Sequence, residues 1–289
     1  WFAQVERVRV INDYTIDFIT TNPNPLFPDS IANFMIMSRE WAEANRAETP
    51  ASQAENHATR NTNGTGPFVL NARSPGVETS LVPNRQWWDE AEHNLTEAIY
   101  TPIENQSTAL SALLSGDIEL ISPVPLQDVR RVESQPGFKV LSGLETRVIM
   151  LGFGHEKEQL DYTNDVRGEN PFQDRRVRQA VYQAIDVATI NRVIMRNAAE
   201  PVSQLIPAGL SGYSEDHDER LPYDPAAARR LLRQAGYPSG FSFGLMCPND
   251  RYLNDEQLCR AVTSMLAEVG LDAELTTMPV RNYWGELRE

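Results

Sequence analysis

The sequence has no long apolar run, few histidines and only two cysteines. A helix that spans a bilayer needs about 18 or more consecutive apolar residues, and no such run occurs in the 289 residues. The four histidines are scattered without the spacing of metal ligands, and no Cys-x-x-Cys pair is present. We therefore expect no transmembrane helix, no metal site and no cofactor.

Basic residues are scarce compared with acidic ones. The chain has 26 Lys and Arg against 40 Asp and Glu, which gives a formal net charge of −14. An acidic globule repels nucleic acid and anionic membranes, so we expect no nucleic-acid partner. The charge otherwise serves solubility.

The familiar catalytic motifs are also missing. There is no G-x-S-x-G, no H-E-x-x-H and no phosphate-binding P-loop. The turn at Gly64 and Gly66 lacks the context of a phosphate site, because residues 68–70 continue as a strand where such a site needs a helix. We therefore expect no catalytic residues, although Asp and Glu are plentiful.

The amino-terminal end lacks both an initiating methionine and a secretion signal, since the chain begins at Trp1. The length allows a buried core in one large domain or two. We expect the sequence to be part of a longer protein.

Residues 170–196 carry the clearest helical pattern in the chain. Apolar residues recur there at the spacing of one helix face, at Val177, Ala180, Val181, Ala184 and Ile185. Asp174 is placed to cap the first turn, and Asp186 is placed to cap a second helix after a shift in phase. The pattern predicts a helix pair packed on a sheet.

The first half of the chain alternates between strand and helix patterns. Residues 5–20 read as a half-buried hairpin and residues 31–43 as a helix. Short elements then alternate as in a mixed α/β sheet. We expect strands at 68–70, 78–82, 97–103 and 117–122, helices at 107–115 and 124–135, and a strand pair at 140–154.

The second half predicts a β-α-β unit. Asp224, Pro225 and Gly236 have the order of cap, first-turn proline and terminator, which predicts a helix over residues 223–236. A strand over 241–246, a helix over 255–269 and a strand over 272–278 follow. The last residues begin another helix.

The amino-acid sequences of several segments resemble those of a known family. The stretches are NPFQDRRVRQAVYQAID, STALSALLSGDIEL, GTGPF and YDPAAARRLLRQAGYPSGF. They are similar to segments of the extracellular solute-binding proteins of ABC importers, family 5, which bind oligopeptides, dipeptides or nickel. The resemblance implies a type II periplasmic-binding-protein fold of two mixed α/β lobes joined by a hinge. It covers nearly all of the chain, which would be only the middle of such a protein.

The resemblance also implies a division of the chain. Residues 1–63 would belong to the peripheral subdomain of lobe I, and 64–155 to its α/β domain. Residues 156–169 would cross the hinge, and 170–289 would form the first part of lobe II.

The loop CPNDRYLND is the best candidate for contacts with a ligand. Ligands of open α/β sheets collect beyond the carboxyl ends of strands, where loops run into helix N-termini. Asn249, Asp250, Arg251 and Tyr252 offer a carboxylate, a guanidinium and an aromatic face to a polar or zwitterionic ligand. The alternative is an ordinary loop in which Asn254 or Asp255 caps the helix.

The resemblance adds two further candidates. Gly152 and Phe153 lie on the segment that corresponds to the family's strand beside the cleft.

Cys247 and Cys259 fall at the end of a predicted strand and in the first turns of the next helix. A disulfide there would close a short loop, and we favour it over two buried free thiols.

The resemblance implies a binding protein rather than an enzyme. It would capture a peptide or similar small polar solute between its lobes and deliver it to the permease subunits of an ABC transporter. We expect a monomer in the periplasm or outside the cell, where a lipid anchor is compatible with the family. The same fold also serves nickel, haem or oligosaccharide binders and sensor domains. An exported hydrolase is the alternative of another class.

Overall fold

The protein is described by a computed structural model, in which residues 3–32, 34–49, 56–160, 163–164 and 169–287 are described. The predicted hinge crossing therefore lies partly outside the described residues, at 161–162 and 165–168. The chain forms two compact units, residues 1–104 and 105–289. The lobe boundaries expected at residues 64, 155 and 170 stay predictions. Every helix within the described ranges is too short or too polar to cross a membrane.

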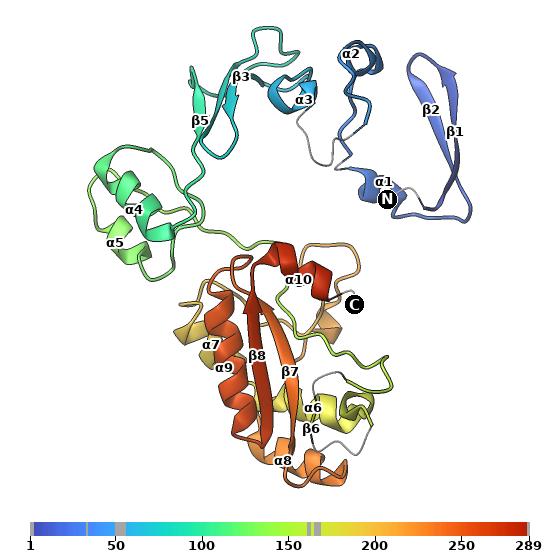
Figure 1. The fold of residues 1–289 in the computed structure, drawn as a ribbon, viewed down its shortest axis with the longest axis vertical. Helices are drawn as coiled ribbons and strands as arrows, with labels where there is room; N and C mark the ends of the chain where they lie inside the picture. Colours follow the sequence, from blue (N-terminus) through green and yellow to red (C-terminus); the bar gives the residue numbers. More distant parts are fainter. Residues whose placement is uncertain (1–2, 33, 50–55, 161–162, 165–168, 288–289) are drawn as a thin grey trace. The chain divides into compact units, whose positions relative to one another are not determined.

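The first unit is built from antiparallel strands with short helices between them (Figure 1). One sheet is the predicted hairpin of β1 (Val5–Asn12) and β2 (Thr15–Thr20). The other has the order β3 (Phe68–Ser74), β4 (Glu78–Pro83) and β5 (Ala98–Tyr100). The helices are α1 (Phe27–Ile31), α2 (Arg39–Ala44) and α3 (His57–Arg60).

Two predictions for this unit are wrong in detail. β1 is almost wholly exposed rather than half-buried, with Val10 at 73% exposure, whereas residues 17–20 of β2 are partly buried. Within the described residues, the single helix expected over 31–43 is formed only from Arg39 onwards, as α2, and α1 ends at Ile31, where the expected range begins. The Ser38 hydroxyl accepts a hydrogen bond from the Trp41 amide at 3.3 Å, which caps a new helix start in the middle of that range.

The second unit holds the helices that the apolar spacing predicts. The longer ones are α4 (Gln106–Ser115), α6 (Arg175–Ala184), α8 (Pro225–Gln234) and α9 (Asp255–Ala267). The shorter ones are α5 (Val129–Glu133), η1 (Pro171–Gln173), α7 (Val187–Val193), η2 (Glu215–His217) and α10 (Val280–Glu286).

The predicted helix caps are confirmed. An oxygen of Asp174 accepts the amide hydrogen of Arg176 at 2.8 Å, and Asp186 accepts that of Thr189 at 2.9 Å. Asp224 does the same for Ala227 at the start of α8, at 2.8 Å. Each carboxylate satisfies an amide that the first turn leaves without a partner.

The strands expected at 117–122 and 140–154 are not formed among the described residues. A strand exists only where a neighbouring backbone completes its hydrogen bonds, and no described segment pairs with either stretch. Leu120 is accordingly 78% exposed. The helix expected over 124–135 is shortened to α5.

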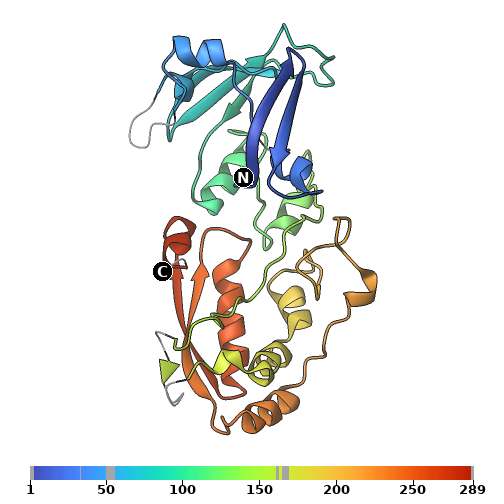
Figure 2. The ribbon, with the colours of Figure 1, turned by 90° about the vertical axis from the view of Figure 1, so that its right-hand side faces the viewer.

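The sheet of the second unit has the order β6 (Thr163–Asn164), β7 (Phe241–Pro248) and β8 (Leu271–Met278). β7 and β8 run parallel and in register from Phe241 opposite Leu271 to Pro248 opposite Met278. α9 connects them, so the predicted β-α-β unit is confirmed. Figure 2 shows α6, α7 and α9 on one side of this strand pair.

The core lies between the strand pair and these helices. Phe241, Phe243 and Cys247 alternate along β7 with more exposed residues, as expected of a strand with one covered face. Their partners include Phe172, whose ring lies 5.8 Å from that of Phe241 and 5.1 Å from that of Phe243. The least exposed core residues come from α6, α8, α9 and β8, namely Val177, Ala180, Val181, Ala184, Ala228, Leu232, Leu266 and Leu271.

The two strands approach each other most closely where they begin. Gly240 and Gly270 both have positive φ, at +76° and +91°. A Cβ added to Gly240 would lie only 1.7 Å from the carbonyl oxygen of Gly270, so no side chain fits there. This contact sets where β7 starts relative to β8.

Replacing Gly240 by alanine tests this close approach. The variant Gly240→Ala suffers both the positive φ, at about 1–2 kcal/mol, and overpacking against Gly270, at about 1–3 kcal/mol more. Gly236→Ala is the matched control, because Gly236 has φ +95° and nothing within 4 Å of an added Cβ. We expect the midpoint of urea unfolding to fall clearly further in Gly240→Ala. Equal shifts in the two variants would contradict the proposed contact.

The helix caps predict how stability depends on pH. Hydrogen bonds from Arg176 lower the pKa of the Asp174 carboxyl, and hydrogen bonds from Thr189 lower that of Asp186. A lowered pKa in the folded state gives stability that is complete above the unfolded value near 4 and is lost as pH falls through the folded value. We therefore expect the urea midpoint to fall as the pH drops below about 4.

The double variant Asp174→Asn/Asp186→Asn separates this effect from general acid unfolding. Asparagine caps a helix as well as aspartate but does not titrate at these positions. The variant should show a shallower fall in the urea midpoint on acidification. A fall as steep as that of the unmodified protein would rule out these two carboxylates as contributors.

Candidate functional site

The predicted ligand loop lies at the carboxyl edge of the parallel strand pair. It runs from the end of β7 to α9, and the Asn249 amide donates to the Met278 carbonyl at 3.0 Å. The ends of β7 and β8 are therefore side by side beneath the loop, with α10 starting next to it. This is the edge at which open α/β sheets bind their ligands.

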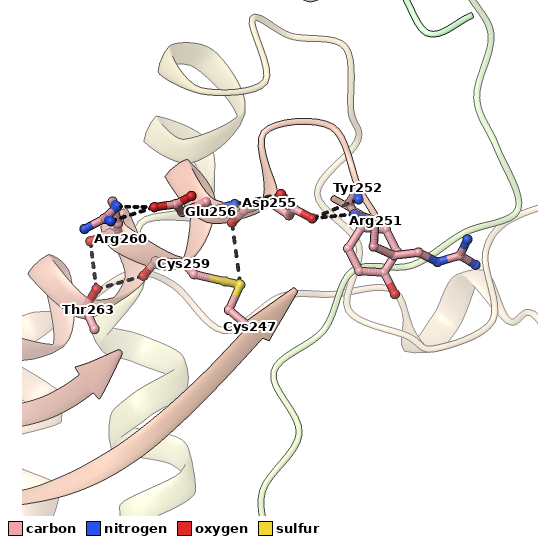
Figure 3. The surroundings of a disulfide bond; sticks show 8 residues. All are labelled: Cys247, Arg251, Tyr252, Asp255, Glu256, Cys259, Arg260 and Thr263. Atoms are coloured by element: carbon pink, nitrogen blue, oxygen red, sulfur yellow. Dashed lines mark hydrogen bonds and ion pairs between the residues drawn. A yellow bond between two sulfur atoms is a disulfide. The ribbon is translucent and has the colours of Figure 1, made fainter. Parts of the chain in front are cut away.

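Asp255 organises the loop from the start of α9. It is only 6% exposed. One carboxylate oxygen accepts the amides of Arg251 at 2.9 Å and Tyr252 at 3.0 Å, and the other accepts the Glu256 amide at 2.9 Å (Figure 3). The carboxylate thus serves the loop as well as the first turn of the helix.

Asn254 does not cap α9 through its side chain, although the sequence allowed it to. Its backbone is left-handed, with φ +55°, and its side chain forms no cap hydrogen bond to α9. The side-chain amide instead donates to the Ile194 carbonyl at 2.9 Å. Asn254 therefore ties the loop to the end of α7.

Asp250 is also used inside the protein. One of its oxygens accepts the amide hydrogen of Val280 at 2.7 Å, at the first residue of α10. The carboxylate that we expected to face a ligand therefore supports the start of α10. Asn249 is exposed beside it.

Two guanidinium groups lie near the ring of Tyr252. The guanidinium carbon of Arg251 is 5.8 Å from the ring centre, and that of Arg147 is 5.6 Å away. Arg147 also pairs with Glu145 at 3.2 Å, whereas Arg251 has no ion pair with any described residue. The Arg251 side chain extends away from the disulfide in Figure 3. Arg251 is therefore the cation available to an anionic group.

A second tyrosine borders this cluster. Burial, and then the neighbouring Tyr252, raises the pKa of the Tyr283 phenol on α10. Its ring is 5.2 Å from that of Trp284. The cluster thus combines positive charge with aromatic faces, which suits a ligand that carries a carboxylate and an apolar side chain.

Phe153 and Gly152 stay predictions as ligand contacts. The ring of Phe153 lies 5.2 Å from that of Phe172 and packs against the core. Gly152 is exposed on the same segment. That segment also contributes Arg147, which could not be found from the sequence because it carries no motif and lies far from the loop along the chain.

The two cysteines are joined in the structure. Cys247 is 2% exposed at the end of β7, and its disulfide partner Cys259 lies 12 residues further on in α9, with the two Cα atoms 6.6 Å apart. The ring closed by the bond contains the whole loop and Asp255. The described residues contain no group of three or more His, Cys, Asp or Glu that is arranged to hold a metal ion.

Comparison with known proteins identifies the class. The whole chain, residues 1–289, matches the family of bacterial extracellular solute-binding proteins, family 5 Middle, and the protein belongs to that family. Its relatives include the glutathione-binding protein GsiB of Escherichia coli strain K12, which is 24% identical over 217 residues. That match covers 74% of this chain and 39% of GsiB.

Solved structures share the fold of this chain. The periplasmic binding protein DppA of Helicobacter pylori, in complex with the peptide STSA, has a TM-score of 0.72 at 24% identity and covers 96% of this chain. A dipeptide-binding protein of Pseudoalteromonas sp. SM9913, in complex with Met-Leu, has a TM-score of 0.71 at 17% identity and covers 98%. The chain spans 51% and 54% of these two proteins. The expected type II periplasmic-binding-protein fold is confirmed.

Removal of the disulfide should loosen this part of the unit. The double variant Cys247→Ala/Cys259→Ala is expected to lose about 2–3 kcal/mol of unfolding free energy, because its unfolded chain has more conformational entropy than the cross-linked one. Urea unfolding measures the loss. Alkylation of the denatured protein should add two labels only after reduction, and labels added without reduction would contradict the bond.

Proposed function

We propose that the protein is the solute-binding component of a bacterial ABC importer. Membership of the solute-binding family supports this function, and the relatives named above bind glutathione and peptides. In this proposal it works as a monomer outside the cytoplasm and hands its solute to the permease subunits in the membrane. The solute leaves unchanged, so no catalytic residue is required.

The proposed solute is a peptide or a similar small molecule with a free carboxylate. The observation that carries this proposal is the cluster at the carboxyl edge, where the Arg251 guanidinium is unpaired among described residues and lies beside the Tyr252 ring. A guanidinium binds a carboxylate through paired hydrogen bonds. The aromatic rings of Tyr252 and Tyr283 offer surface to an adjoining apolar side chain.

The proposed mechanism is closure of two lobes on the solute. Lobe I would comprise residues 1–155, lobe II would begin at residue 170, and the segment between would act as the hinge. A solute that contacts both lobes stabilises the closed state and so shifts the population towards it. The proposal uses three of the residues expected to bind from the sequence, namely Asn249, Arg251 and Tyr252. One oxygen of Asp250 supports the start of α10, and Gly152 and Phe153 stay predictions.

A melting-temperature screen of the full-length protein tests this function. The panel contains glutathione, the dipeptide Met-Leu, the tetrapeptide Ser-Thr-Ser-Ala, agropinic acid and nickel with histidine, which are solutes of the relatives and of other proteins with this fold. We expect a peptide or another carboxylate solute to raise the melting temperature. A shift with nickel and histidine alone, or with none of the panel, would contradict the proposed solute class.

The variant Arg251→Gln then tests the site for any solute that binds. Loss of a charged hydrogen bond should weaken binding roughly ten- to a hundredfold in calorimetric titration. Arg260→Gln is the matched control, because Arg260 is exposed on α9 and pairs with Glu256 at 2.6 Å. Equal affinities of the two variants would remove Arg251 from the site.

A further inference from the structure

We propose that Asp255 is a positioning residue for the candidate solute site. Its carboxylate fixes the backbone of Arg251 and Tyr252, and so holds the guanidinium and the ring where a solute meets them. This inference rests on the proposed function for its effect on binding. The structural part of the inference, the hold on the loop, is tested independently of any solute.

The contacts of Asp255 are unusual for a surface loop. A carboxylate that is 6% exposed is costly unless its oxygens are fully engaged. Three backbone amides supply the hydrogen bonds, those of Arg251, Tyr252 and Glu256. No lysine or arginine forms an ion pair with it among the described residues. The charge is therefore balanced by the loop itself, which makes the loop conformation depend on this side chain.

The ends of the loop are held by other bonds. The disulfide joins the end of β7 to α9, Asp250 accepts from Val280, and Asn254 donates to Ile194. The amides of Arg251 and Tyr252 lie between these attachments. Asp255 is the described residue whose side chain binds both amides. Its own amide also donates to the Tyr252 carbonyl at 3.3 Å, so Asp255 holds the middle of the loop while the other bonds hold its ends.

Asp255 acts through its neighbours rather than on the solute. Its oxygens face backbone amides, whereas the Tyr252 ring has the guanidinium carbons of Arg147 and Arg251 at 5.6 Å and 5.8 Å from its centre. A site whose groups are already in place avoids the ordering cost of binding. Loss of Asp255 should therefore weaken binding without removing any group that touches the solute.

Hydrogen–deuterium exchange of the full-length protein tests the hold on the loop. In Asp255→Ala we expect the amides of Arg251 and Tyr252 to exchange about tenfold faster or more, since a hydrogen bond to a charged group is lost. Asp255→Asn should retain most of the protection, because the amide oxygen can still accept both hydrogens. Amides within β7 and β8 should be unchanged in both variants.

Asp218→Ala is the matched control for a carboxylate that holds a loop. Asp218 accepts the Ser203 amide at 2.8 Å, the Ser203 hydroxyl at 3.0 Å and the Tyr213 hydroxyl at 3.1 Å. These contacts lie in the loop between α7 and α8, away from the candidate ligand residues. The control should speed exchange at Ser203 and leave Arg251 and Tyr252 protected.

Exchange and binding decide separate questions. Unchanged exchange at Arg251 and Tyr252 in Asp255→Ala overturns the positioning role, whatever the solute. Faster exchange throughout β7 and β8 also overturns it, because Asp255 would then support the whole unit.

Glutathione serves as the binding probe, and we expect its affinity to fall about tenfold in Asp255→Ala and much less in Asp255→Asn. If glutathione fails to bind the unmodified protein, the choice of solute is wrong and the exchange result alone decides the positioning role.

Discussion

β7 and β8 run parallel in register from Phe241 opposite Leu271 to Pro248 opposite Met278. A parallel pair brings both carboxyl ends to one edge, so the loop after β7 and the start of α10 after β8 must lie together. The close approach of Gly240 to Gly270 sets the register at the other end. The buried face of the pair then holds α6, α8 and α9 in one core. The position of the candidate site follows from this single pairing.

The candidate site shows a division between residues that bind and residues that hold. Three side chains of the loop and the start of α9 form hydrogen bonds with the backbone of neighbouring segments, namely those of Asp250, Asn254 and Asp255. This leaves the side chains of Asn249, Arg251 and Tyr252 for the proposed solute. A loop held by these bonds, with Arg251 unpaired among the described residues, would suit the reversible binding proposed above, because little order has to be created on binding.

Sequence analysis predicted the parts of the fold that depend on local pattern. The stripe from Val177 to Ala184, the caps Asp174, Asp186 and Asp224, and the β7-α9-β8 unit are all visible in the spacing of apolar and capping residues. The strand expected at 117–122 has the same local alternation but no pairing backbone among the described residues. Local pattern cannot reveal whether a distant partner exists, which is why that prediction was wrong.

The same distinction applies to the candidate site. The loop could be located because it follows a strand and precedes a helix. The approach of Arg147 to Tyr252 depends on the path of a segment without regular structure, and no spacing rule describes it. The role of Asp255 was hidden for another reason: an aspartate at a helix start reads as a cap whether its oxygens serve the helix or the loop before it.

In the proposed function, a solute binds at the carboxyl edge of the β7–β8 pair. The most direct measurement compares hydrogen–deuterium exchange of the full-length protein with and without a solute that raises its melting temperature. The account predicts slower exchange at residues 249–252 and around Arg147, with no change at residues 236–242 at the opposite edge. Protection confined to that opposite edge, or absent from residues 249–252, would contradict it.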